Sequence, residues 1–118
     1  MQTEVQIRDG CIVCRPVGTL EADTAPRLRE AMALVSSARR LVIDLSEVSF
    51  IDSAALAVLV GGIRRLHEAD GMVAVCSRGH VRRVLETVGF ERVAAMVATV
   101  ADAQRIVTMG ATPLVNAG

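Results

Sequence analysis

The chain has 118 residues, which is enough for one domain with a hydrophobic core and too few for two. Thirteen arginines balance thirteen acidic residues, and tryptophan and tyrosine are absent, so neither net charge nor aromatic stacking favours a nucleic-acid partner. The longest uncharged apolar run, 54–63, is about half of what crosses a bilayer, and the polar N-terminus does not resemble a signal peptide. We therefore expect a single cytoplasmic domain that does not bind membranes.

The first segment of the chain predicts a β-hairpin. Val5 and Ile7 alternate with polar residues, and an apolar stretch follows the Asp9-Gly10 pair. Asp-Gly readily adopts the positive φ angles of a two-residue turn. Because Pro16 lacks an N–H group, we expect the second strand to bulge or to have an unpaired stretch there.

Helical and strand patterns alternate after the hairpin. Asp23 or Thr24 is expected to cap the first helix, Gly89 to end the third, and Thr99 with Asp102 to begin the last. A glycine pair inside the second helix, Gly61-Gly62, weakens it by roughly 1 kcal/mol per residue, so close packing against a neighbour is expected there. The expected elements after the hairpin are a helix near 25–35, a strand at 41–45, a helix at 53–69, a strand at 72–76, a helix at 80–88, a strand within 92–100 and a helix ending near 109.

This order predicts an α/β fold. We expect a single domain over residues 1–109, with a mixed sheet of about five strands packed with about four helices. The N-terminal hairpin would be antiparallel, and the later strands parallel through right-handed crossovers. Residues 110–118 are expected to form a flexible C-terminal tail.

The three cysteines are predicted to be buried structural residues. Cys11 and Cys14 spell a CxxC motif, but residues three apart in a strand point to opposite faces and lie about 10 Å apart. They therefore cannot bond each other or share a metal. A thiol switch would require Cys76 to lie within about 7 Å of one of them, measured between Cα atoms.

No arrangement of residues in the sequence predicts catalysis. Phosphate-binding glycine loops and metal-ligand spacings are missing, so we expect no enzyme activity, no cofactor and no metal. Ser53 follows a strand and opens a helix, as a hydrolase nucleophile does. A nucleophile elbow, G-x-S-x-G, needs a glycine on each side of the serine, and the stretch around Ser53, with Asp52 before it and Ala54 after it, contains none, so we expect no nucleophilic role.

The same position suits a phosphate. A phosphate on Ser53 would face the unpaired N–H groups and the positive dipole of a helix start, a favourable interaction of about 1 kcal/mol. It would also add about 1.5 to 2 negative charges beside Asp52, which would repel a partner built to contact a neutral hydroxyl. Phosphorylation is therefore expected to change binding rather than folding.

Three stretches resemble a known family. The central "LVIDLSEVSFIDSAALAVLVGGIRRL", with "GTLEADTAPRL" upstream and "VRRVLETVGF" downstream, is similar to the STAS domain, and specifically to the stand-alone anti-sigma factor antagonists of bacteria. The similarity extends from about Val5 to Ile106. The central stretch is the specific part of it.

The resemblance implies a role for each matching residue. It implies that Ser53 is the phosphoacceptor and Asp52 its flanking acid. Glu21 stands where the family commonly has an aspartate in a Gly-Glu-Leu-Asp loop, so Gly18, Leu20 and Glu21 are expected to form the second rim of the partner surface. The implied partner is an anti-sigma factor with a GHKL-type serine kinase fold. This kinase binds the unphosphorylated protein, which frees the sigma factor, and the complex dissociates after phosphorylation.

The sequence departs from the family motif at two positions. Ala54 replaces the usual serine or threonine and Ala55 the usual glycine, which we expect to remove a hydroxyl and add a methyl at the contact surface. Two interpretations of Ser53 stay open: a phosphoacceptor, or a serine that only caps the helix.

Other functions are also compatible with the pattern. One is an accessory subunit of an ABC-type transport complex, as in small STAS proteins of lipid-transporting systems, where Ser53 would contact an ATPase subunit without phosphorylation. Nucleotide sensing rests on family analogy alone, because the chain has no phosphate loop. We expect the protein to be a monomer or a weak dimer.

Overall fold

The structure, a computed structural model, describes residues 1–109. The expected flexible tail, 110–118, lies outside the described residues. The described part contains six strands, four α-helices and one 3₁₀ turn. In chain order they are β1 (Gln2–Arg8), β2 (Cys11–Leu20), α1 (Ala25–Leu34), β3 (Arg40–Asp44), β4 (Val48–Ile51), α2 (Ser53–Glu68), β5 (Met72–Cys76), α3 (Gly79–Thr87), η1 (Phe90–Arg92), β6 (Ala95–Val97) and α4 (Val100–Met109).

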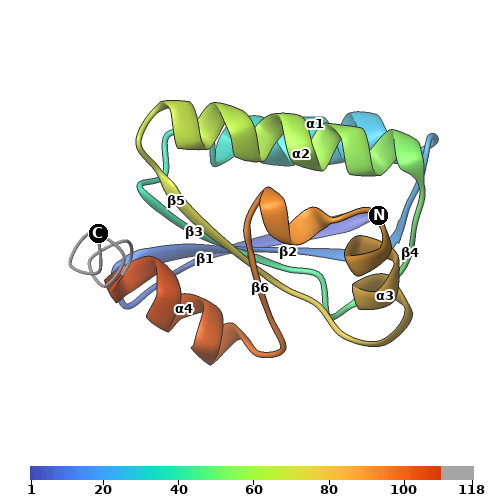
Figure 1. Ribbon diagram of the computed structural model, residues 1–118. Coiled ribbons are helices and arrows are strands. Elements are labelled where there is room, and N and C mark those ends of the chain that lie inside the picture. Colours follow the sequence, from blue (N-terminus) through green and yellow to red (C-terminus); the bar gives the residue numbers. More distant parts are fainter. Residues whose placement is uncertain (110–118) are drawn as a thin grey trace.

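The strands form one mixed sheet in the order β1-β2-β3-β5-β6, with β4 attached to β2. The β1–β2 pair is antiparallel, and all other pairs are parallel. Helices α1 and α2 lie together along one face of the sheet, α4 lies on the opposite face, and α3 lies at one end beside β4 (Figure 1). The predicted α/β fold is confirmed, with one strand more than the five expected.

The hairpin turn forms as predicted. Asp9 and Gly10 have φ angles of 51° and 83°, and the β1–β2 register runs without interruption from Arg8↔Cys11 to Gln2↔Val17. On its other side, β2 pairs with β3 over residues 12–14 and with β4 over residues 18–20. Pro16 lies in the gap between these two pairings, so the predicted unpaired stretch is confirmed.

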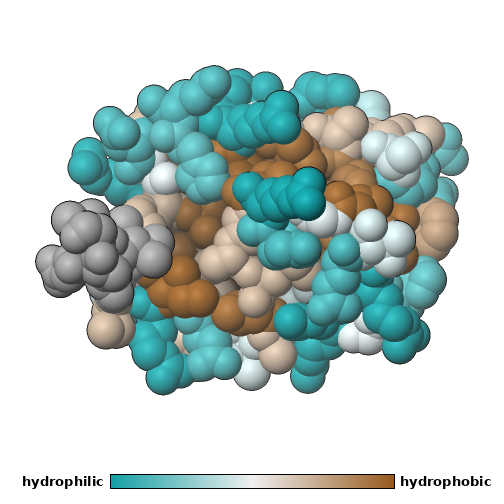
Figure 2. Space-filling view, in the orientation of Figure 1, coloured by the Kyte–Doolittle hydropathy of each residue, from teal (hydrophilic) through white to brown (hydrophobic). Residues whose placement is uncertain are grey.

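The sheet separates two apolar clusters. The larger one lies under α1, α2 and α3, and the smaller one lies under α4. In the space-filling view, apolar surface gathers in the middle of the visible face, between polar surface above and below it (Figure 2). Partly buried side chains that pack against the larger cluster include Leu56, Val60, Val84, Val93 and Met96.

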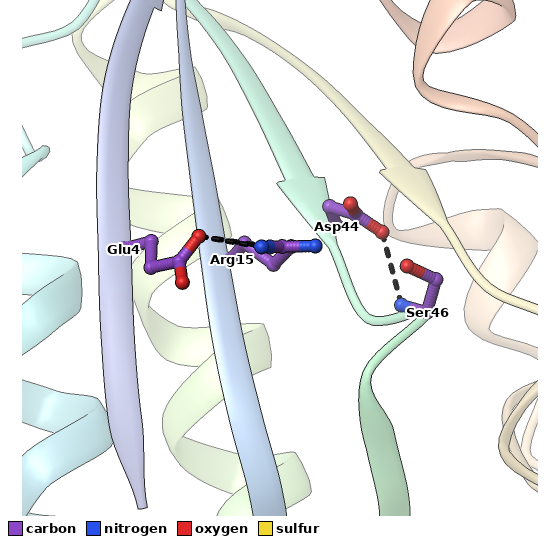
Figure 3. A network of polar contacts seen from close by, with 4 residues as sticks. All are labelled: Glu4, Arg15, Asp44 and Ser46. Carbon is purple, nitrogen blue, oxygen red and sulfur yellow. Dashed lines mark hydrogen bonds and ion pairs between the residues drawn. The ribbon is translucent and has the colours of Figure 1, made fainter.

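Strand β4 follows a turn that Asp44 stabilises. The Asp44 side chain is 5% exposed, and its Oδ1 accepts a hydrogen bond from the Ser46 backbone N–H at 2.9 Å. On the other side of Asp44 lies Arg15, which donates to Glu4 Oε1 across the hairpin at 2.6 Å (Figure 3). After this short turn the chain pairs with β2 again, further along that strand, as β4.

Helix α2 packs through a face that includes one of its two central glycines. A Cβ at Gly62 would lie 2.6 Å from Cε and 3.2 Å from Cβ of Met32 on α1, so the predicted close packing is confirmed there. At Gly61 a Cβ would meet nothing closer than an arginine nitrogen at 3.7 Å. The left-handed residue at the end of α2 is Asp70, with φ of 64°, and it precedes Gly71.

The last strand is shorter than the sequence pattern suggests. Gly89 has φ of 73° and ends α3 as predicted, and the chain then forms the η1 turn. Phe90 is 1% exposed, so its burial holds this turn against the core. Thr99 starts α4 as expected, because its hydroxyl accepts a hydrogen bond from the Asp102 N–H at 3.1 Å.

Candidate functional site

The ends of β2 and β4 bring the candidate site residues together. These strands are parallel, so their carboxyl ends lie at the same edge, with Gly18 beside Val48 and Leu20 beside Ile51. The Asp52 N–H donates to the Leu20 carbonyl at 2.9 Å, which continues the contact past the strands. The loop after β2 and the start of α2 are therefore neighbours, although about 30 residues separate them in the sequence.

The Asp52 carboxylate holds these two segments to each other. Oδ1 accepts from the Ala55 N–H at 3.0 Å and Oδ2 from the Ala22 N–H at 3.0 Å. Asp52 is thus the N-cap of α2 and also an anchor for the loop after β2. Both oxygens are engaged with backbone, which fits a positioning role better than acid–base chemistry.

Thr24 folds the loop back on itself. Its hydroxyl accepts from the Glu21 N–H at 2.9 Å and lies 2.9 Å from the Thr19 carbonyl oxygen, to which it donates. Thr24 occupies the N-cap position of α1 but makes no side-chain hydrogen bond to that helix. The position of the predicted cap is confirmed, while its hydroxyl shapes the loop instead.

Gly18 is required by the local backbone. Its φ is +112°, in the region that favours glycine, and the β2–β4 register shifts between Gly18 and Thr19. The Gly18 N–H donates to the Glu47 carbonyl at 3.1 Å. The irregularity lies just before the loop that contacts the start of α2 through the Ala22 N–H.

Ser53 is the first residue of α2 and is exposed to solvent. None of the side-chain hydrogen bonds within residues 1–109 involves its hydroxyl, and the bond at the start of the helix is made by Asp52. The interpretation of Ser53 as a helix cap is wrong, because the capping carboxylate belongs to Asp52, whose extended backbone (φ −108°, ψ 178°) is that of an N-cap. The fold therefore does not depend on the Ser53 hydroxyl, which is accessible for modification or for contact with a partner.

Two of the expected contact residues are not on the surface. Leu20 and Ala55 are each 0% exposed and belong to the larger apolar cluster. The expectation that the Ala55 methyl alters the contact surface is wrong, since the first turn of α2 directs it inward. The exposed members of the predicted set are Ser53 and Ala54, while Gly18, Glu21 and Asp52 are half-buried.

Sequence reasoning missed an aromatic residue beside the site. Phe50 lies opposite Thr19 in the β2–β4 pairing, and its side chain is 42% exposed. An exposed phenylalanine is a typical contact for another protein. The signal was available in the sequence, since Phe50 is one of only two aromatic residues and lies three positions before Ser53.

A shallow groove continues the site along the outer side of α2. It has a volume of about 250 Å³ and is bounded by Arg29 of α1 and Arg65 of α2. Its floor is made of small residues, which include Ala54, Ala57 and Gly61. The surface next to Ser53 is therefore flat and basic at its margins.

The three cysteines are buried and unbonded. Cys14 and Cys76 lie on β2 and β5, which are separated by β3, so their Cα atoms are about 10 Å apart or more. This separation exceeds the disulfide limit, and the hypothesis of a thiol switch is wrong. Burial raises the pKa of both the Cys14 and the Cys76 thiols to about 11, which keeps them protonated and unreactive.

In the part of the chain that the structure describes, no three histidine, cysteine or acidic side chains gather as a metal site would require. None of the helices within residues 1–109 is both long and apolar enough to span a bilayer.

Comparison with known proteins identifies the family. The model of the STAS domain matches residues 2–103, which is most of the chain. The chain belongs to the STAS domain family. Its similar proteins include BtrV of Bordetella bronchiseptica, which is named as an anti-sigma factor antagonist and is 31% identical over 85 residues, 70% of this chain and 73% of BtrV.

Solved structures agree with this assignment of the STAS domain. An anti-sigma factor antagonist from Mycobacterium paratuberculosis superposes with a TM-score of 0.84 at 33% identity, covering 91% of this chain and 93% of that one. The Bacillus protein SpoIIAA, solved in its phosphorylated form, has a TM-score of 0.65 at 17% identity, covering 86% and 96%, and so shares the fold. By homology and fold, the protein is a member of the anti-sigma factor antagonists.

Proposed function

We propose that this STAS domain is a partner-switching regulator that binds an anti-sigma factor with a GHKL-type serine kinase fold. In its unphosphorylated form it holds that kinase, so that a sigma factor is released. Phosphorylation of Ser53 breaks the complex. The observation that carries the proposal is the exposed, unbonded Ser53 hydroxyl at the start of α2, beside a loop that Asp52 ties to the same helix.

The proposed contact surface consists of exposed and half-buried residues around Ser53. Glu21 and Gly18 contribute from the loop after β2, and Phe50 contributes from β4. Ala54 continues the surface into the groove on α2. Leu20 and Ala55 support it from the core. Asp52 holds the loop after β2 against the start of α2.

A phosphate on Ser53 would have opposite effects on folding and on binding. At the first position of α2 it faces the positive end of the helix dipole, which is worth about 0.3–1 kcal/mol at an exposed site. The partner, however, would have to bury about 1.5 to 2 added negative charges close to the Asp52 carboxylate. The domain would stay folded while the complex dissociates.

The surroundings of Ser53 suit a kinase substrate. The hydroxyl is solvent-exposed, and no described side chain competes for it. SpoIIAA, which has the same fold, was solved in a phosphorylated form. Ala54 has no hydroxyl, so the residue that follows Ser53 cannot be phosphorylated in its place.

Phosphorylation is tested with the partner kinase and ATP. Intact-mass measurement of the wild-type protein is expected to show the addition of a single phosphate, and Ser53→Ala is expected to show none. Ser49→Ala is the matched control, because Ser49 is another exposed serine, on β4. Equal labelling of Ser53→Ala and wild type would contradict the site assignment.

Binding is tested separately by calorimetry with the same kinase. Ser53→Asp is expected to weaken the complex at least tenfold. Phe50→Ala is also expected to weaken it, while Ser53 remains the residue that is phosphorylated. A pull-down that returned an ATPase subunit of a transporter instead of an anti-sigma factor would replace the proposed partner.

A further inference from the structure

Within residues 1–109, the outer edge of β1 is unpaired along its whole length. Strand β1 is the first of the sheet, and within residues 1–109 no strand pairs with its outer edge. Six of its seven residues are exposed. Among them Ile7 is 83% exposed and Val5 is 46% exposed, which is unusual for two large apolar side chains side by side on one face of a strand.

This edge lacks most of the features that usually keep edge strands apart. Exposed edges are commonly protected by charged side chains, a proline, a β-bulge or a very short length. Strand β1 is seven residues long, contains no proline, and keeps an unbroken register with β2, and its two charged side chains, Glu4 and Arg8, are of opposite sign. It is therefore a competent template for one more strand.

The hairpin geometry fixes which backbone groups are available. The residues that flank a two-residue turn, Arg8 and Cys11, form a hydrogen-bonded pair, and hydrogen-bonded and open pairs alternate from there. Thr3, Val5 and Ile7 therefore direct their N–H and C=O groups away from β2. These are the groups that an additional antiparallel strand would bind.

The sequence of β1 is complementary to itself. When two copies run antiparallel about Gln6, Val5 of each copy faces Ile7 of the other on one side of the sheet. On the other side, Glu4, which also accepts from Arg15 of its own chain, faces Arg8 of the second copy, twice by symmetry. A register centred on Val5 would place Glu4 opposite an uncharged glutamine, so charge selects the register centred on Gln6.

We propose that β1 pairs antiparallel with β1 of a second copy of this chain, about a two-fold axis at Gln6, and joins the two sheets into one. The contact is isologous, as in most dimers. Because it is small, it is expected to be weak, with a dissociation constant in the micromolar range.

The dimer leaves the Ser53 surface accessible. The second copy pairs with the edge of β1 that faces away from β2, whereas β4, which leads to Ser53, pairs with the opposite edge of β2. The inference therefore does not rest on the proposed function.

The first test is sedimentation velocity of the wild-type protein and of one exposed apolar variant. The wild type is expected to shift from monomer to dimer as its concentration rises, and Ile7→Lys to remain monomeric. Leu34→Lys is the matched control, because Leu34 is 78% exposed but lies on α1, and this variant is expected to dimerise like the wild type. A wild type that stays monomeric up to about 1 mM would overturn the proposal.

The second test exchanges the charges. In a dimer of Glu4→Arg, an arginine would face Arg8 of the other copy at both symmetric positions. In a dimer of Arg8→Glu, a glutamate would face Glu4 of the other copy at both positions. Each variant alone is therefore expected to be monomeric. Mixed in equal amounts they restore both ion pairs, and a heterodimer is expected. Circular dichroism checks that each variant is folded. If the folded variants stay apart on mixing, the register and the proposal fail together.

Discussion

Two pairs of identical neighbours on α2 lie in opposite surroundings. Ala54 is exposed and borders the groove beside Ser53, whereas Ala55 is fully buried. Two turns later Gly61 faces the same groove, whereas Gly62 packs against Met32. One residue step rotates a side chain by about 100° around a helix, so the outer face can serve a partner while the inner face serves the core.

The largest effect is expected deep on the inner face. Ile63 is 0% exposed, and Ile63→Ala should lower the free energy of unfolding by about 2–5 kcal/mol, because it leaves a cavity. Urea denaturation followed by circular dichroism measures this. Arg64→Ala, one step outward, is the control and should change stability by less than about 0.5 kcal/mol.

The alanine pair offers a sharper contrast. Ala55→Leu must force a larger side chain into the packed core and should cost about 1–3 kcal/mol. Ala54→Leu should leave the denaturation midpoint nearly unchanged and instead weaken partner binding, since it fills the groove. Equal loss of stability in both variants would contradict the assignment of Ala55 to the inner face and Ala54 to the outer face of α2.

The glycine pair should change stability in opposite directions. Gly61→Ala has room for a methyl and should raise the free energy of unfolding by about 0.5–1 kcal/mol through helix propensity. Gly62→Ala gains the same propensity but must displace Met32, so we expect a net loss of about 1 kcal/mol. Thermal unfolding of the two variants side by side is the measurement.

The smallest effect on stability is expected at Ser53. Because Asp52 provides the cap, Ser53→Ala should change the free energy of unfolding by less than about 0.5 kcal/mol, whereas Asp52→Ala should cost about 1 kcal/mol or more. A large loss in Ser53→Ala would mean that its hydroxyl supports the helix after all.

Much of the fold follows from local patterns in the sequence. The Asp9-Gly10 turn, the end of α3 at Gly89 and the start of α4 at Thr99 were predictable, because each depends on the conformation of one or two residues. The buried strands were predictable from their continuous apolar runs.

The features that were missed depend on distant pairing. Strand β4 has only four residues of mixed polarity and exists because β2 is available beside it. Both Asp52 and Ser53 are good cap residues, so only the backbone conformation decides between them. The burial of Leu20 likewise follows from the β2–β4 contact and not from any local periodicity.

The pairing of β2 with β4 also bears on how the protein moves. It spans three residues of β2 and is interrupted by the shift at Gly18, whereas the ladder between β3 and β5 in the centre of the sheet runs unbroken over five residues. A short, irregular ladder can open without disturbing the rest of the sheet. Amide protons of this segment should therefore exchange with solvent well before those of β3 and β5, and the surface around Ser53 can adjust to a partner at little expense to the fold.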